Sequence, residues 1–415
     1  MYGKKRTRVK PGHYNPDSLT VFSNTGIKGA AMSSRRTSLI SFLLIAFILI
    51  AGKPAIANEP LGKRLSAGAT QSLYVDPEGQ LWAWGNVTNG KTKSIKPVKI
   101  MDNVKSVSAS TGVSYSFAVK KDGSAWGWGD NTFGQIRPNT GSSTAYINKP
   151  VKVMDNVRIV ESGHATVFAI KNDHTLWGWG APGRRRGDII HANSSTPSRI
   201  MDNVAMASSS ISHTIAVDEN NTFWGWGDNR CPSYPEKRHL PVKVDLDALG
   251  GRKITSISNT MGQTFAVTSD GLLWQWGADR KVHRTCLTDN MIHPVQMKGI
   301  DHVKAIAPGK DYLLILKKDG TVWSWNWAKS PLKSIPKYRQ IPLTGIIEIA
   351  AGDHHFLALK KDGTVWAAGA NQYGQLGNNS TKYSDVPVKV ELPEQMIWHQ
   401  TALDIFAEYA GVMID

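Results

Sequence analysis

The stretch that decides the fold is Asp362-Gly363-Thr364-Val365-Trp366-Ala367-Ala368-Gly369-Ala370-Asn371-Gln372-Tyr373-Gly374-Gln375-Leu376-Gly377. Asp-Gly between two apolar segments is a strong hairpin signal, because both turn residues tolerate positive φ. The apolar strand His355 to Leu359 precedes this turn, and the small-residue strand Ile349 to Gly352 comes before it. The outer strand starts at Pro387, since a sheet edge tolerates a residue without an N–H. The pattern therefore predicts a unit of four short strands.

The same order of strands recurs along the chain at intervals of 43 to 51 residues, each copy marked by a leading tryptophan: Trp82, Trp126, Trp177, Trp224, Trp274, Trp323 and Trp366. This period is the length of one four-stranded propeller blade. The hairpin turn has looser versions at Asp173-His174 and Asn220-Asn221, and the sixth repeat has Pro342-Leu343 as its best outer-strand candidate. We predict an all-β fold, a seven-bladed β-propeller of four-stranded blades over residues 58–390.

Thirteen of the fifteen tryptophans lie in the repeat signature. Exposed aromatic rings could stack on sugars, but a tryptophan at a fixed strand position in every unit indicates packing between blades. We therefore expect a structural role for Trp82, Trp84, Trp126, Trp128, Trp177, Trp179, Trp224, Trp226, Trp274, Trp276, Trp323, Trp325 and Trp366.

These residues resemble the regulator of chromosome condensation repeat family, whose units combine Gly-x-x-His, Asp-Gly, Trp-Gly-x-Asn-x-x-Gly-Gln-Leu-Gly and Pro-x-x-Val. The resemblance covers about residues 65 to 390 and is fullest in the seventh repeat. It implies a seven-bladed propeller. The doubled Trp-x-Trp-Gly looks like the bacterial exported branch, which includes the beta-lactamase inhibitory protein type II superfamily. The family histidine, kept only at His213 and His355, is expected inside a blade; Gln71, Tyr115, Thr166, Gln263 and Tyr312 replace it elsewhere.

The N-terminal segment is basic and then apolar. Residues 1–57 hold nine Lys and Arg against one Asp, so they carry half of the chain's net charge of +16. Leu39 to Ala51 is an apolar run that follows Arg35-Arg36 and precedes Ala55-Ile56-Ala57, which is the pattern of a secretory signal. The run is shorter than the ~20 residues of a spanning helix. We expect a disordered or untranslated prefix (1–31) and a signal peptide (32–57), with an uncleaved N-terminal anchor as the alternative.

The end of the chain, residues 391–415, is expected to be a partial eighth repeat that completes the ring; the alternative is a sequence truncated inside a longer repeat array. Export leads to an oxidising compartment, so Cys231 and Cys286, in equivalent loops of adjacent repeats, are a candidate disulfide; two free thiols are the alternative.

The sequence carries no His-x-x-x-His or Cys-x-x-Cys spacing, no phosphate-cradling loop before a helix and no nucleophile elbow. We expect no metal, no cofactor and no catalytic residues. The loops between third and fourth strands differ most between repeats and should all emerge on one face of the ring. Their arginines and aromatic residues are types that protein-binding hot spots favour. The candidate binding residues are Arg184, Arg185, Arg186, Tyr146, Tyr234, Arg284, Trp327, Tyr338 and Tyr373.

The leading interpretation is an exported, non-catalytic binding module, secreted or in the cell envelope, that presents variable loops to a protein partner. One alternative is a cell-envelope protein that binds anionic wall polymer, which would be salt-sensitive. A second is an enzyme inhibitor of the beta-lactamase inhibitory type. Nucleotide exchange and chromatin binding, the activity that gives the family its name, are opposed by the export signal, so nucleic acid is not an expected partner. After signal cleavage no membrane span is expected.

Overall fold

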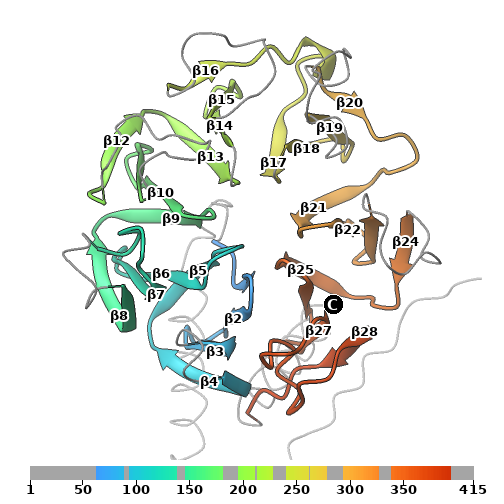
Figure 1. The fold of residues 1–415 in the computed structure, drawn as a ribbon. Coiled ribbons are helices and arrows are strands. Elements are labelled where there is room, and N and C mark those ends of the chain that lie inside the picture. The colour runs from blue at the N-terminus through green and yellow to red at the C-terminus, as the bar shows by residue number, and fades with distance from the viewer. Residues whose placement is uncertain are drawn as a thin grey trace, which may run out of the picture. The chain divides into compact units, whose positions relative to one another are not determined.

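The computed structural model describes residues 62–87, 93–137, 145–180, 195–210, 213–227, 240–260, 262–277, 293–326 and 338–393. Within these residues, 28 strands form seven four-stranded antiparallel sheets, and the one helical turn is the 3-10 turn η2 (Asp247–Leu249). The sheets follow one another around a ring (Figure 1). The predicted all-β, seven-bladed propeller is confirmed.

Each blade consists of four strands that are consecutive in sequence and in the sheet. Blades 1 to 4 are β1 (Leu65–Ala67), β2 (Gln71–Val75), β3 (Leu81–Asn86), β4 (Lys93–Met101); β5 (Val104–Ala109), β6 (Tyr115–Lys120), β7 (Ala125–Asp130), β8 (Tyr146–Met154); β9 (Val157–Ser162), β10 (Thr166–Lys171), β11 (Leu176–Gly180), β12 (Ser198–Met201); and β13 (Val204–Ser209), β14 (His213–Asp218), β15 (Phe223–Gly227), β16 (Val242–Lys243). Blades 5 to 7 are β17 (Ile254–Asn259), β18 (Gln263–Thr268), β19 (Leu273–Gly277), β20 (Val295–Gln296); β21 (Val303–Pro308), β22 (Tyr312–Lys317), β23 (Val322–Asn326), β24 (Tyr338–Ile341); and β25 (Ile346–Ala351), β26 (His355–Lys360), β27 (Val365–Gly369), β28 (Ser384–Lys389).

The outer strand of the sixth blade differs from the prediction. Its residues are Tyr338–Ile341, so the strand ends just before the expected pair Pro342-Leu343. Tyr338 pairs with Trp325 and stacks on Trp323, with ring centroids 4.7 Å apart, so aromatic packing fixes the strand there. Pro342 therefore follows the outer strand of this blade instead of starting it.

The ring closes by direct contact of the first and last blades. The first strands of neighbouring blades contact one another around the centre, and β1 contacts both β25 and β26. Seven apolar clusters lie between neighbouring blades, and the one that joins blades 7 and 1 contains Trp84, Leu357 and Leu376. Closure is therefore built within residues 65–390. The predicted partial eighth repeat beyond residue 393, like the predicted prefix and signal peptide, lies outside the described residues.

Where a signature has two tryptophans, as in the first six repeats, the two side chains have different partners. The leading indole N–H donates within its own blade to the hairpin: to Asp76 and Asp218 directly from Trp82 and Trp224, and to a Ser or Thr hydroxyl in the other five blades. In blade 7 the Thr364 hydroxyl donates to Asp362 at 2.6 Å and accepts from Trp366 at 3.2 Å. The same hydroxyl contact contributes to lowering the pKa of Asp362.

The second tryptophan reaches the preceding blade. Trp84 and Trp179 donate their indole N–H at 2.8 Å to the carbonyl oxygens of Gln375 and Gln135, which lie in the Gly-Gln loops of blades 7 and 2. Trp128, Trp226 and Trp276 are buried in the clusters between blades 1 and 2, 3 and 4, and 4 and 5. In the six repeats that have both tryptophans, the pair thus stabilises one hairpin and one blade junction; the seventh repeat has Trp366 alone.

The family histidine position lies at the junction between blades, not inside one as expected. His355 Nε2 is 2.9 Å from the Ser72 hydroxyl, and His213 Nε2 is 3.1 Å from the Thr264 hydroxyl, in each case in the next blade. Three of the five replacements also reach the next blade: Gln71 donates to the Tyr115 carbonyl, and the Tyr115 and Tyr312 hydroxyls donate to the carbonyls of Gly163 and His355. A polar side chain of sufficient length explains why His, Gln and Tyr interchange here.

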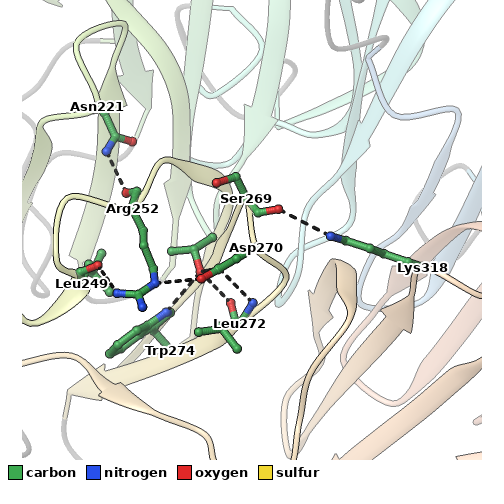
Figure 2. A network of polar contacts seen from close by, with 9 residues as sticks. Asn221, Leu249, Arg252, Ser269, Asp270, Leu272, Trp274 and Lys318 are labelled. Carbon is green, nitrogen blue, oxygen red and sulfur yellow. Dashed lines mark hydrogen bonds and ion pairs between the residues drawn. The ribbon is translucent and has the colours of Figure 1, made fainter.

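The hairpins carry left-handed residues even where the sequence lacks glycine. His174 has φ 63° and Asn221 has φ 65°, so both looser turns keep the conformation of Gly123 and Gly271. The Asn221 side-chain oxygen also accepts the Ile254 N–H at 2.8 Å. The 3-10 turn η2 lies in the connection between β16 and β17. Figure 2 shows the adjoining network: Arg252 bonds Asp270 at 2.8 Å and lies over Trp274.

Candidate binding face

Antiparallel order divides the connections between two ends of the ring. Turns between first and second strands leave the blade at the same end as the long loops between third and fourth strands, and we call this end the loop face. Hairpins between second and third strands and the connections between blades lie at the other end, the hairpin face. The seven variable loops therefore leave their blades on the loop face, whatever their sequence.

The loops of blades 2 and 7 are held by the two amides of their signature. Asn131 Oδ1 accepts the Ile136 N–H at 2.8 Å, and Asn371 Oδ1 accepts the Leu376 N–H at 2.9 Å. Gln135 and Gln375 accept the N–H of Phe133 and Tyr373 in the same way. All four amide side chains are buried. Because the neighbouring blade's indole bonds each loop as well, the residues between Asn and Gln are presented on a fixed frame.

This frame exposes aromatic side chains. Phe133 and Tyr146 are each 43% exposed at the start and end of the blade 2 loop, and Tyr383 is 61% exposed in blade 7. Phe133 and Tyr383 were missed in the sequence analysis. Phe133 occupies a variable position between the signature Asn and Gln, the one signal that could have singled it out.

The other candidate residues lie in different surroundings. Tyr373 is half-buried, and the Lys93 ammonium of blade 1 lies 4.9 Å from its ring centroid, so it belongs to the junction of blades 7 and 1. Tyr338 lies in β24 against Trp323, and burial raises its pKa to about 12. Arg184, Arg185, Arg186, Tyr234, Arg284 and Trp327, and the cysteines Cys231 and Cys286, lie outside the described residues.

Backbone hydrogen bonds link neighbouring blades at the centre of the loop face. The Lys310 N–H donates to the Asp353 carbonyl, the Asp353 N–H to the Gly68 carbonyl and the Ala69 N–H to the Ser110 carbonyl, at 3.0 to 3.3 Å. Burial raises the pKa of the Asp353 carboxyl and lowers the pKa of His164.

Within the described residues no group of three His, Cys, Asp or Glu side chains could hold a metal ion. The same part of the chain has no helix long and apolar enough to cross a membrane.

Comparison with known families supports the repeat assignment. Residues 104–135 and 346–375, and in a second description residues 362–402, match the Regulator of chromosome condensation (RCC1) repeat. These matches fall on blades 2 and 7, the two blades that keep the loop signature. No curated protein is detectably similar to the chain in sequence.

Solved structures share the fold at low identity. Human WBSCR16 has a TM-score of 0.60 at 20% identity, covering 72% of this chain and 86% of its own. Prp20p of Saccharomyces cerevisiae, whose structure was described with its binding properties to Gsp1p and histones, has a TM-score of 0.61 at 16% identity, covering 80% and 88%. A chain from the complex of Kap60 with yeast RCC1 (Prp20) has a TM-score of 0.60 at 17% identity, covering 82% and 90%. The chain is a seven-bladed propeller with repeats that match the regulator of chromosome condensation repeat.

Proposed function

We propose that this protein is an exported, non-catalytic binding module that holds a protein partner on its loop face. The observation that carries the proposal is the exposure of Phe133, which lies between the two buried amides of a loop bonded to the next blade, and of Tyr146 at the start of β8. A rigid frame lowers the conformational entropy lost on binding. Exposed aromatic rings supply the large contact area typical of interface hot spots.

The sequence of the remaining loops supports the same face. Arg184, Arg185 and Arg186 follow β11, and Tyr234, Arg284 and Trp327 follow β15, β19 and β23. Each of these strands ends at the loop face. Arginine offers a bidentate fork to carboxylates, so the sequence adds arginines after β11 and β19 to the exposed aromatic rings of blade 2. Proteins of similar fold, such as Prp20p, are described with protein partners.

The proposal is tested by affinity capture from an envelope extract of the source organism with the tagged full-length protein. The double variant Phe133→Ala, Tyr146→Ala should lose the captured protein, while Val295→Ala, an exposed apolar side chain on the outer strand of blade 5, should keep it. Capture that is equal for both variants would refute the assignment of the face. Retention of wall polymer that is released by salt, with no protein retained, would favour the wall-binding alternative.

A further inference from the structure

The first strands of the seven blades carry an excess of cations at one equivalent position near the centre of the hairpin face. In six blades the strand register places there Lys105, Arg158, Ala205, Thr255, Lys304 and Ile347, and in blade 1 the equivalent residue is Lys63, two residues before β1; we call these seven residues the central rim. Four of these seven residues are cationic and none is acidic. Lys and Arg make up 49 of 415 residues, so fewer than one cation would be expected among seven positions.

The rim side chains run around the centre of the ring. Arg158 Nη2 donates at 3.0 Å to the carbonyl of Ala205, and Lys304 Nζ donates at 3.3 Å to the carbonyl of Ile347; each acceptor is the rim residue of the next blade. Solvent reaches this region, since the Lys63 side chain is 65% exposed and Ile347 is 40% exposed. Lys63 and Lys304 are therefore accessible to solvent, Lys105 is partly exposed, and Arg158 is buried.

Two rim cations lack a countercharge. Lys63 pairs with Glu161 at 3.1 Å, and Arg158 lies 4.0 Å from Glu219, which also bonds His174. Among the described residues, Lys105 and Lys304 have no carboxylate within 4.0 Å. They belong to blades 2 and 6, three blades apart, which is the largest separation in a ring of seven.

The acidic residues lie further along the first strands. Glu348 is one residue past the rim in β25, where its carboxylate accepts the Leu65 N–H at 2.8 Å, and Glu161 is three residues past the rim in β9. Positive charge at the rim followed by carboxylates deeper in the ring would hold an anion at the entrance and oppose its passage inward.

We propose that the central rim binds a multivalent anion of the phosphate class, held between Lys105 and Lys304. This site is on the opposite face from the proposed partner site and does not depend on it. A single carboxylate can neutralise only one of the two lysines, whereas a polyphosphate carries several charges along one molecule. The rim is therefore a second binding site, with a small or polymeric phosphate as its ligand.

The test is isothermal titration of the full-length protein with inorganic tripolyphosphate at low ionic strength. The double variant Lys105→Gln, Lys304→Gln should bind at least tenfold more weakly. The control pair Lys99→Gln, Lys152→Gln removes the same charge from outer strands, where each lysine is already paired with an Asp at 2.7 Å, and should bind as wild type. The cations of residues 1–57 are common to all variants.

Two further measurements test whether the positive charge is required and which class of ligand binds. Lys105→Arg, Lys304→Arg should retain binding, because both positive charges are kept. Equal weakening by both glutamine pairs would show a net-charge effect and would overturn the proposal. No binding of tripolyphosphate, or binding of a poly-glutamate peptide in its place, would overturn it as well.

Discussion

His355 should make the junction of blades 7 and 1 sensitive to acid. Its ring is 1% exposed, and burial, with a smaller contribution from His354, lowers its pKa from 6.5 to about 3. The Ser72 hydroxyl donates to the Gln375 carbonyl at 2.8 Å, so it must accept from His355 Nε2–H. Nδ1 is then the unprotonated nitrogen, and it has no hydrogen-bond partner in the described structure. A proton on Nδ1 would enter a buried site with no acceptor.

The sign follows from the two pKa values. Because the folded pKa lies below the unfolded one, the unfolded chain binds more protons, and the stability is complete above pH 6.5 and declines as the pH falls toward 3. At pH 5 the unfolded imidazole favours its protonated form by about 1.5 pH units, which corresponds to about 2 kcal/mol lost relative to neutral pH.

The assay is urea denaturation at pH 7 and pH 5, followed by tryptophan fluorescence. The variant His355→Gln carries the residue that this position has in blades 1 and 5, where Gln71 and Gln263 stand. It should lose about 2 kcal/mol less than wild type between the two pH values. His213, whose pKa is lowered to about 4, is present in both proteins and cancels. Equal losses in wild type and variant would refute the reasoning.

Three further substitutions test the packing. Gly377→Ala should destabilise the protein by about 3 kcal/mol, because φ is +62° and an added Cβ would lie 2.8 Å from the Trp84 ring; urea denaturation within 1 kcal/mol of wild type would contradict this. Thr364→Val should cost about 1 kcal/mol, measured in the same way, since it removes the hydroxyl between Asp362 and Trp366, and a neutral effect would refute that role. Arg252→Gln should cost no more than about 1 kcal/mol despite the network in Figure 2, because both partners of its ion pair with Asp270 are about two-fifths exposed; a larger thermal or urea shift would count against this.

The fold could be predicted because each repeat contains local sequence signals for its own strands and turns. The Asp-Gly turn, the Trp at a fixed strand position and the edge proline specify one blade, and the spacing sets their number. The prediction for the sixth outer strand was wrong because the stacking of Tyr338 on Trp323 fixes the position of this strand. No local sequence pattern indicates this contact.

The candidate site was harder to predict because exposure is a property of the packed ring. Tyr146 and Tyr373 occupy similar loops in the sequence, yet one is exposed and the other meets Lys93 across the blade junction. The different hydrogen bonds of Trp82 and Trp84 likewise depend on the packed ring, because the acceptor for Trp82 lies in its own blade and the acceptor for Trp84 lies in blade 7. The central rim was invisible in the sequence, since its residues are about fifty positions apart and only the strand register aligns them.

The loop face as a partner site is tested most directly by a structure of the full-length protein bound to the protein that it captures. The account predicts contact on the loop face, with Phe133 and Tyr146 buried by the partner. A partner seated on the hairpin face, with both aromatic rings still exposed, would contradict it.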